Sequence, residues 1–169
     1  MSPTGTKRAF TTIELTVALA IMVVMSTLVV VSMGPALREA RLRSGCRMIV
    51  SALNYARGYA VTRQTYTRVV VDEAGCGVSV EARVRDQNDE ERLVPVTTPS
   101  GRYRRLPREV VVADVRKLGT DRDERFVGFS QLGQADNAVI RVVDVRGKQR
   151  VITVDAITGR CTVAIQQRE

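Results

Sequence analysis

A run of 20 residues without a charged side chain, Leu15–Gly34, is the feature that most constrains how this chain of 169 residues can fold. At about 1.5 Å per residue, a helix of that length covers roughly 30 Å, the thickness of the hydrocarbon layer of a bilayer. The run is longer than the apolar part of a secretory signal, and it ends in Val31-Ser32-Met33-Gly34-Pro35 rather than in a small-residue cleavage site. The sequence therefore predicts one membrane-spanning helix near the N-terminus.

Glu14 lies directly before this run, after Phe10 and Ile13. A carboxylate inside a membrane helix costs on the order of 2.5–3.5 kcal/mol on insertion scales, so it usually has a partner. The apolar run offers no basic side chain. We therefore expect the partner of Glu14 to come from a neighbouring molecule.

Residues 7–15, with the sequence Lys-Arg-Ala-Phe-Thr-Thr-Ile-Glu-Leu, resemble the N-terminal signal of type IV pilins and of the pseudopilins of type II secretion systems. The resemblance implies cleavage by a prepilin peptidase between Ala9 and Phe10, at a site where the family usually has glycine instead of Ala9. It also implies methylation of the new N-terminus at Phe10. In the assembled filament, Glu14 would pair with the terminal amine of a neighbouring subunit, because a lone charge in an apolar core is costly.

The resemblance further implies a single-pass protein of the inner membrane with its C-terminal domain in the periplasm. The implied partners are the prepilin peptidase, other pilin or pseudopilin subunits, an inner-membrane assembly platform and membrane lipid. Basic residues alone favour the opposite orientation, because two precede the run and more follow it. They are Lys7 and Arg8 before the run, and Arg38, Arg41, Arg43 and Arg47 after it.

Residues 35–65 are expected to continue the helix, with a kink or an interruption at Gly34-Pro35. Apolar residues follow one another there at spacings of 4, 3, 4, 3 and 4, which is typical of one buried helix face. These residues are Leu42, Cys46, Ile49, Leu53, Ala56 and Ala60. We expect this stripe to pack on a sheet, with Cys46 as a small apolar residue within it.

After Gln64 the pattern changes to short runs rich in β-branched residues, separated by glycine, proline and other turn residues. Such spacing is typical of antiparallel strands joined by hairpins, and Arg146-Gly147-Lys148 is predicted to form one hairpin tip. The predicted strands are Thr67–Asp72, Gly77–Val84, Arg92–Thr97, Glu109–Val115, Arg125–Ser130, Ala138–Val145, Arg150–Asp155 and Arg160–Ile165. The predicted fold is α+β and pilin-like: a long N-terminal helix, membrane-spanning in its first half, packed on an antiparallel β-sheet.

The predicted organisation is a leader peptide at 1–9, a transmembrane and assembly helix at 10–34, an amphipathic helix at 35–65 and a β-rich periplasmic domain at 66–169. Leu53…Ala56-Arg57…Ala60…Arg63 is similar to the helix end of GspH/FimT-type minor pseudopilins. Two later segments are more loosely similar to the last strands of that subfamily. They are Phe126–Phe129 with Gly133, and Ile157-Thr158-Gly159-Arg160. Residues 86–107 have no counterpart in the resemblance, and we expect a variable loop there.

The chain contains no histidine and no nucleophile motif, which argues against an enzyme. Its three cysteines include no Cys-x-x-Cys pair, so metal and redox motifs are unsupported. Cys76 and Cys161 lie in or beside predicted strands; a disulfide is one expectation for a periplasmic domain, and small buried thiols are the other. No cofactor is expected, with calcium held by Asp121, Asp123 and Glu124 as the weaker alternative to a solvated turn.

The formal net charge of +8 suggests an acidic partner, although a solvated arginine-rich surface is the simpler explanation. Arginines flank Tyr103, and Lys148 marks a second basic edge, so these positions are candidates for nucleic-acid contact. The candidate residues are Arg102, Arg104, Arg105 and Lys148. An acidic run is expected to form an exposed loop; it comprises Asp86, Asp89, Glu90 and Glu91.

Taken together, these features favour a minor pseudopilin: a structural subunit of a type II secretion pseudopilus, matured by prepilin peptidase and assembled through its N-terminal helix. The alternative is a minor type IV pilin involved in pilus assembly or in DNA binding and uptake, because some FimT-like minor pilins bind DNA. A bare membrane anchor of unrelated function is the simplest remaining interpretation. It predicts that Glu14→Ala changes nothing.

Overall fold

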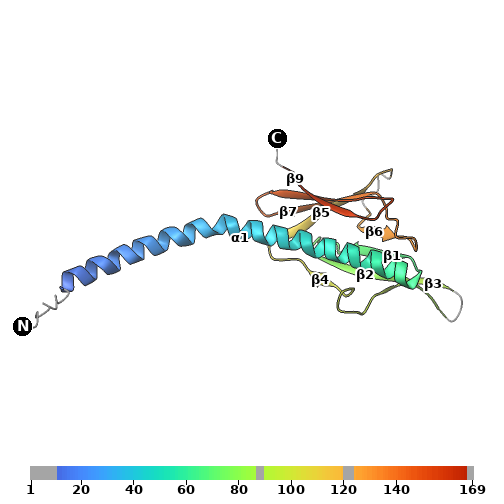
Figure 1. Ribbon diagram of the computed structural model, residues 1–169, viewed down its shortest axis with the longest axis horizontal. Helices are drawn as coiled ribbons and strands as arrows, with labels where there is room; N and C mark the ends of the chain where they lie inside the picture. The colour runs from blue at the N-terminus through green and yellow to red at the C-terminus, as the bar shows by residue number, and fades with distance from the viewer. Residues whose placement is uncertain (1–10, 87–89, 120–123, 167–169) are drawn as a thin grey trace, which may run out of the picture. The chain divides into compact units, whose positions relative to one another are not determined.

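The structure is a computed structural model that describes residues 11–86, 90–119 and 124–166, without the side chains of residues 27–33 and 166. The chain divides into two compact units, Met1–Leu37 and Arg38–Glu169. Helix α1 runs from Thr12 to Arg63 and contributes to both units (Figure 1). The sequence predicted either a kink or an interruption of the helix at Gly34-Pro35. The interruption is wrong, because the helix continues through Pro35. Proline removes a single hydrogen bond from a helix, and the following turns of α1 are held by packing.

The helical part of the second unit buries the stripe that the sequence predicts. The six stripe residues are at most 2% exposed, and Ala52 joins them. The helix ends because Gln64 has a positive φ of 50°, which lets the Thr65 N–H bond the carbonyl of Ala60 at 3.1 Å. This left-handed residue with its backward hydrogen bond is a Schellman-type helix end.

Among the described residues, nine strands follow the helix and form two antiparallel sheets. The first sheet has the order β3-β2-β1-β6, and β4 also pairs with β2. Its strands are β1 (Thr67–Val71), β2 (Gly77–Arg85), β3 (Glu91–Pro95), β4 (Arg104–Arg105) and β6 (Phe126–Phe129). The second sheet has the order β5-β7-β8-β9. Its strands are β5 (Val110–Lys117), β7 (Ala138–Asp144), β8 (Gln149–Val154) and β9 (Cys161–Gln166). All eight predicted strands are therefore present, and β4 was not predicted.

The hydrophobic core lies between the helix and both sheets, as Figure 1 shows for the second unit. Strands alternate buried and half-exposed residues, so that each sheet turns one face to the helix. Valine and isoleucine dominate this core, and Phe129 adds a fully buried ring. Thr67, also fully buried, donates its hydroxyl to the Ala56 carbonyl at 2.9 Å and so links β1 to the helix.

The segment 86–107, expected as a variable loop, is largely attached to the first sheet. Val96 donates its N–H to the Val80 carbonyl and Leu106 donates to that of Cys76, both at 2.8 Å. Both side chains are nearly buried, at 6% and 5% exposure. The expectation of a loop holds for only part of the segment, because residues 91–95 and 104–105 are strands that pair with β2.

The predicted hairpin tip at Arg146-Gly147-Lys148 is confirmed between β7 and β8. A carboxylate oxygen of Asp144 accepts the N–H groups of Arg146 and Lys148, each at 2.9 Å. Gly147 has a φ of 81°, which glycine adopts without steric cost. The turn therefore owes its shape to one aspartate and one glycine.

Candidate assembly site and basic surfaces

The first described turn of α1 carries Glu14, the predicted assembly residue. Thr11 precedes the helix, and its hydroxyl accepts the N–H of Glu14 at 3.3 Å. Thr11 is therefore the N-cap, and Glu14 occupies the third helical position. A carboxylate at this position is stabilised by the positive end of the helix dipole. The Thr-x-x-Glu spacing of a capping box is visible in the sequence, but the sequence reasoning missed this local role. Ala9 and Phe10, the predicted processing residues, lie outside the described residues.

The side chains of α1 from Thr12 to Ser26 are exposed. Nine large apolar residues among them have exposures between 52% and 72%. They are Ile13, Leu15, Val17, Leu19, Ile21, Met22, Val23, Val24 and Met25. Within the described parts of the chain, no helix meets the combined length and hydropathy of a membrane span. The predicted transmembrane helix 10–34 includes residue 10 and the side chains 27–33, which lie outside the description.

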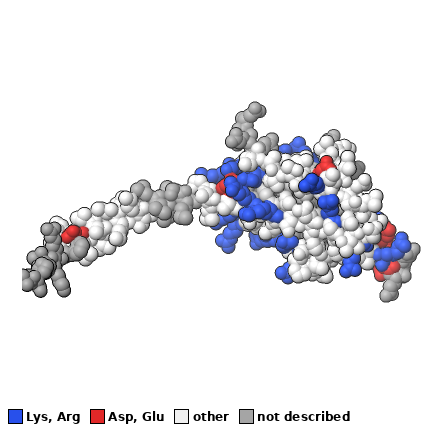
Figure 2. Space-filling model, in the orientation of Figure 1, with Lys and Arg blue, Asp and Glu red and all other residues white. Residues whose placement is uncertain are grey.

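Glu39 is the centre of a charged cluster in the second unit. It forms ion pairs with Lys148 at 2.5 Å, with Arg43 at 3.2 Å and with Arg150. These partners, Lys148 first, lower the pKa of Glu39 from 4.5 to about 2, against a smaller opposing effect of burial. The cluster joins the helix to the β7–β8 hairpin, 111 residues away along the chain. Figure 2 shows a gathering of Lys and Arg side chains on this part of the second unit.

The residues proposed for nucleic-acid contact come from two different sheets. Arg104 forms part of β4 in the first sheet and donates to the Ser100 carbonyl at 2.8 Å. Arg102 and Arg105 are exposed, and their side chains form no hydrogen bond or ion pair with the described residues. The Arg102 N–H donates to the Thr98 carbonyl at 3.0 Å, and Arg105 pairs with Gly77 in the sheet. Lys148, in contrast, belongs to the hairpin of the second sheet and is held by Glu39. The four residues are thus not one continuous chain segment or strand edge.

The predicted disulfide between Cys76 and Cys161 is not formed, and all three cysteines are free. Cys76 lies in the turn before β2, where its thiol contacts the Ala74 carbonyl at 3.5 Å. Cys161 instead opens β9 in the other sheet and packs against the core. Burial raises the pKa of the Cys161 thiol and of the Cys46 thiol. The two cysteines thus belong to different sheets, and Cys46 is a core residue, as predicted.

Glu124, one of the three residues considered for calcium, is bound by a lysine. The ammonium of Lys117 lies 2.5 Å from Glu124 and 2.9 Å from Asp136. Burial acts to lower the pKa of Lys117, but the two carboxylates outweigh it and the pKa is raised. Asp121 and Asp123 lie outside the described residues. Within the described part of the chain, no three metal-ligating side chains come together.

Three residues of the acidic run, Asp86, Glu90 and Glu91, lie where β2 ends and β3 begins, and the Asp86 N–H donates to the Glu90 carbonyl at 2.9 Å. Asp89 lies outside the described residues. Glu91 begins β3 and pairs with Arg83 at 3.0 Å. Glu90 pairs with Arg92 at 2.9 Å. These residues are exposed, as expected, but a basic neighbour faces each of these two glutamates.

Arg57 connects the two loosely similar sequence segments in space. A Cβ added at Gly159 would lie 2.9 Å from the side chain of Arg57, and one added at Gly133 would lie 3.5 Å from it. Both glycines also have positive φ angles, of 62° and 80°. The helix-end pattern and the closing Thr158-Gly159 turn therefore meet around one arginine. The sequence similarity identified these segments one by one and did not indicate that they lie close together.

No family model matches the chain, and no curated protein matches it by sequence. Among solved structures, it is similar to the minor pseudopilin EpsH from the Type 2 Secretion System of Vibrio cholerae, with a TM-score of 0.58 and 8% identity. That match covers 76% of this chain and 99% of EpsH. GspH of E. coli is similar with a TM-score of 0.58 and 11% identity, over 75% of this chain and 89% of that one.

Identities of this size establish a common fold and nothing finer. The two matches extend over 76% and 75% of this chain and over 99% and 89% of the two solved chains. The predicted α+β class, with a long helix packed on antiparallel strands, is confirmed. The chain therefore has the pilin-like fold of the minor pseudopilins.

Proposed function

We propose that this chain is a minor pseudopilin, a structural subunit that assembles through its N-terminal helix. The observation that carries the proposal is the exposed apolar surface of α1 between Ile13 and Met25, on a chain with the pseudopilin fold. Soluble monomers rarely expose apolar patches larger than a few hundred Å². An apolar helix surface of this extent therefore requires lipid or other helices around it.

The same apolar helix would be surrounded first by lipid and later by other helices. Before assembly it anchors the chain in the inner membrane, with residues 38–169 in the periplasm. After removal of the leader at Ala9 and methylation of Phe10, it packs among the helices of other pilin or pseudopilin subunits. The prepilin peptidase and an inner-membrane assembly platform are the further partners of this route. Its setting is a type II secretion pseudopilus.

Glu14 would supply the charged contact between subunits, paired with the terminal amine of a neighbouring Phe10. Its place in the first turn of α1 supports this assignment, because its carboxylate would lie close in sequence to the new terminus. The hydrogen bond from its N–H to Thr11 gives it a second, purely local role. A test must therefore separate the charge of Glu14 from its contribution to the helix start.

Two variants make that separation. Glu14→Gln keeps the shape of the residue and removes the charge, whereas Thr11→Ala removes the N-cap and keeps the charge. We expect Glu14→Gln to abolish crosslinking of the chain into pseudopili and Thr11→Ala to retain most of it, at similar membrane levels of both variants. If Glu14→Gln assembles like the wild type, the proposed pairing is wrong.

DNA binding by a minor type IV pilin is the second candidate function. Arg102 and Arg105 favour it, because they are exposed without a partner among the described residues. Phosphate contacts would make the affinity fall steeply with salt. Arg102→Gln/Arg105→Gln should then weaken DNA binding measured at low salt. Absence of binding by the wild-type chain under those conditions would remove this candidate.

A further inference from the structure

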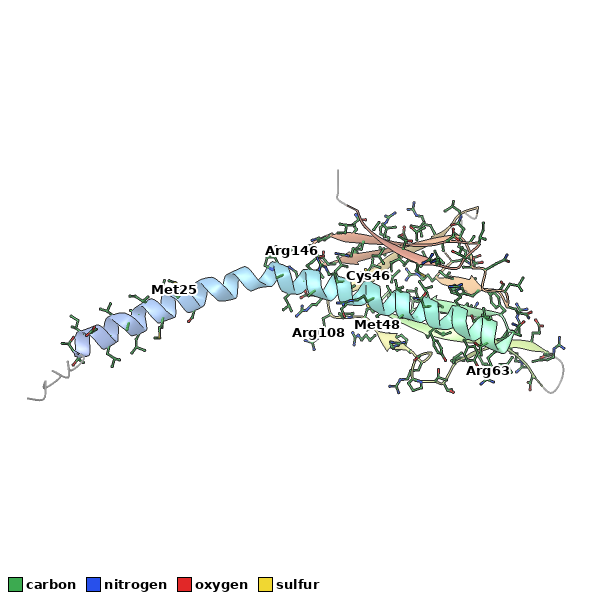
Figure 3. All side chains as sticks on the ribbon, viewed as in Figure 1. Met25, Cys46, Met48, Arg63, Arg108 and Arg146 are labelled. Atoms are coloured by element: carbon green, nitrogen blue, oxygen red, sulfur yellow. The ribbon has the colours of Figure 1, made fainter. Side chains whose placement is uncertain are left out.

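A cavity of about 360 Å³ lies between the helix and the outer strand of the second sheet. Its lining residues are Arg43, Cys46, Arg47 and Val50 from α1, Arg150 from β8 and Val163 from β9. Cys46, labelled in Figure 3, is 2% exposed and forms part of the base. The cavity thus has an apolar base between three arginines, and all of it belongs to the second unit.

The register of β8 and β9 explains why the cavity is open. Cys161, Val163 and Ile165 alternate along β9 and turn the same face toward the helix side. Cys161 packs on the core, whereas Val163 is 40% and Ile165 59% exposed. The apolar face of β9 therefore becomes progressively uncovered toward its C-terminal end. Among the described strands β9 pairs only with β8, so its outer backbone edge is unpaired as well (Figure 1).

The charges around the cavity are not balanced. Glu39 neutralises Arg43 and Arg150, but it also holds Lys148. Arg47 is exposed and has no ion-pair partner in the part of the chain that the structure describes. The side chain of Arg150 is only 10% exposed, yet its Nε lacks a hydrogen-bond partner there. That atom is itself buried, so Arg47 is the cation at the cavity that a ligand can reach.

We propose that this cavity and the edge of β9 bind an extended peptide segment of a partner protein that carries an acidic side chain. The peptide backbone adds to the free edge of β9, as in other cases of strand addition. An apolar side chain covers Val163, and a carboxylate reaches Arg47. The size of the cavity lies at the lower end of the range for ligand sites.

This inference rests on the proposed function, because the partner would be a neighbouring subunit, but its test needs no assembled filament. The full chain, purified in detergent and immobilised near its N-terminus, would be used to select from a library of random nonapeptides. We expect enrichment of peptides that alternate apolar residues and contain at least one Asp or Glu. Enrichment of neutral or basic peptides, or of none, would overturn the proposal.

Variants then locate the binding of a selected peptide. Arg47→Gln should weaken it about tenfold, the size of effect expected for a close charge pair. Val163→Asp should weaken it at least as much, while Arg102→Gln, with an equal loss of charge elsewhere, should leave it unchanged. Methylation of alternate peptide nitrogens should abolish binding, because strand addition needs those N–H groups. Equal binding by the methylated peptide would contradict strand addition.

A lipid headgroup is the competing occupant for the same arginines. Water-soluble dihexanoyl-phosphatidylglycerol serves as its probe. If this lipid binds the wild type but not Arg47→Gln, and no peptide is selected, the cavity recognises lipid and the proposal is wrong. None of these outcomes depends on Glu14, so failure here is distinct from failure of the assembly contact.

Discussion

Replacing Glu39 with glutamine should destabilise the second unit in a manner that depends on pH. The ion pairs with Lys148, Arg150 and Arg43 lower the pKa of Glu39 from 4.5 to about 2. At 1.36 kcal/mol per pKa unit, this difference corresponds to about 3.4 kcal/mol of stability at neutral pH. The Glu39 side chain is 19% exposed, and solvent screening reduces that upper value. We therefore expect Glu39→Gln to lower the free energy of unfolding by about 1–2 kcal/mol at pH 7.

The sign of the pH dependence follows from the depressed pKa. A carboxyl group with a lower pKa in the folded state stabilises the fold fully above its unfolded pKa of 4.5. That stability is lost as the pH falls through about 2, where the folded protein also takes up the proton. The difference between the wild type and Glu39→Gln should accordingly be constant above about pH 5 and shrink between 4.5 and 2.

Urea unfolding followed by far-ultraviolet circular dichroism measures this difference at a series of pH values. Glu90→Gln is the matched control, because Glu90 and its partner Arg92 are 64% and 62% exposed. Exposed pairs of this kind contribute about 0–1 kcal/mol. The reasoning is refuted if Glu39→Gln costs no more than the control, or if its cost is the same at pH 2 and at pH 7.

Three further predictions test other parts of the fold by the same measurement. Gly159→Ala should cost about 2–3 kcal/mol, because the residue has a φ of 62° and its new Cβ would lie 2.5 Å from the Gly133 carbonyl oxygen; Gly58→Ala, with open space around it, should instead stabilise the helix by about 0.5–1 kcal/mol. An equal effect of both substitutions would contradict this account of Gly159. Thr67→Val should cost about 1 kcal/mol through loss of the buried hydrogen bond to the helix, and a neutral result would show that this bond is dispensable. Lys117→Met should cost about 1–2 kcal/mol at pH 7 by leaving two carboxylates facing each other, and the cost should diminish above the ordinary lysine pKa of about 10.5, since a raised pKa stabilises the fold only while the amine is charged; a cost that persists at pH 12 would refute this reasoning.

Most of the fold could be predicted from the local periodicity of apolar residues. The helical stripe from Leu42 to Ala60 and the eight strands are visible in the sequence because spacing decides which face of an element is buried. β4 was missed because a pair of arginines, Arg104 and Arg105, has no strand pattern of its own and depends on β2 for its hydrogen bonds. Both β3 and β4, which lie within the segment expected as a loop, pair with β2.

The charged and cavity-lining groups were beyond sequence reasoning for a different reason. Glu39 and Arg150 are 111 residues apart, and only the register of β8 under the helix brings them together. Lys148 was predicted as a nucleic-acid contact from its neighbours in sequence, whereas its neighbour in space is Glu39. The spacing Thr11-x-x-Glu14 predicts an N-cap at Thr11, and in the structure the Thr11 hydroxyl accepts the Glu14 N–H.

The mass and N-terminal sequence of the mature protein, purified from membranes of cells that express its own prepilin peptidase, test the central proposal most directly. A chain that assembles as a pseudopilin should start at a methylated Phe10, with residues 1–9 removed. Expression of the chain in cells that lack the peptidase provides the control and should leave the leader in place. A protein that keeps Met1 in the presence of the peptidase would contradict the proposed maturation and, with it, assembly through the helix that begins with Phe10.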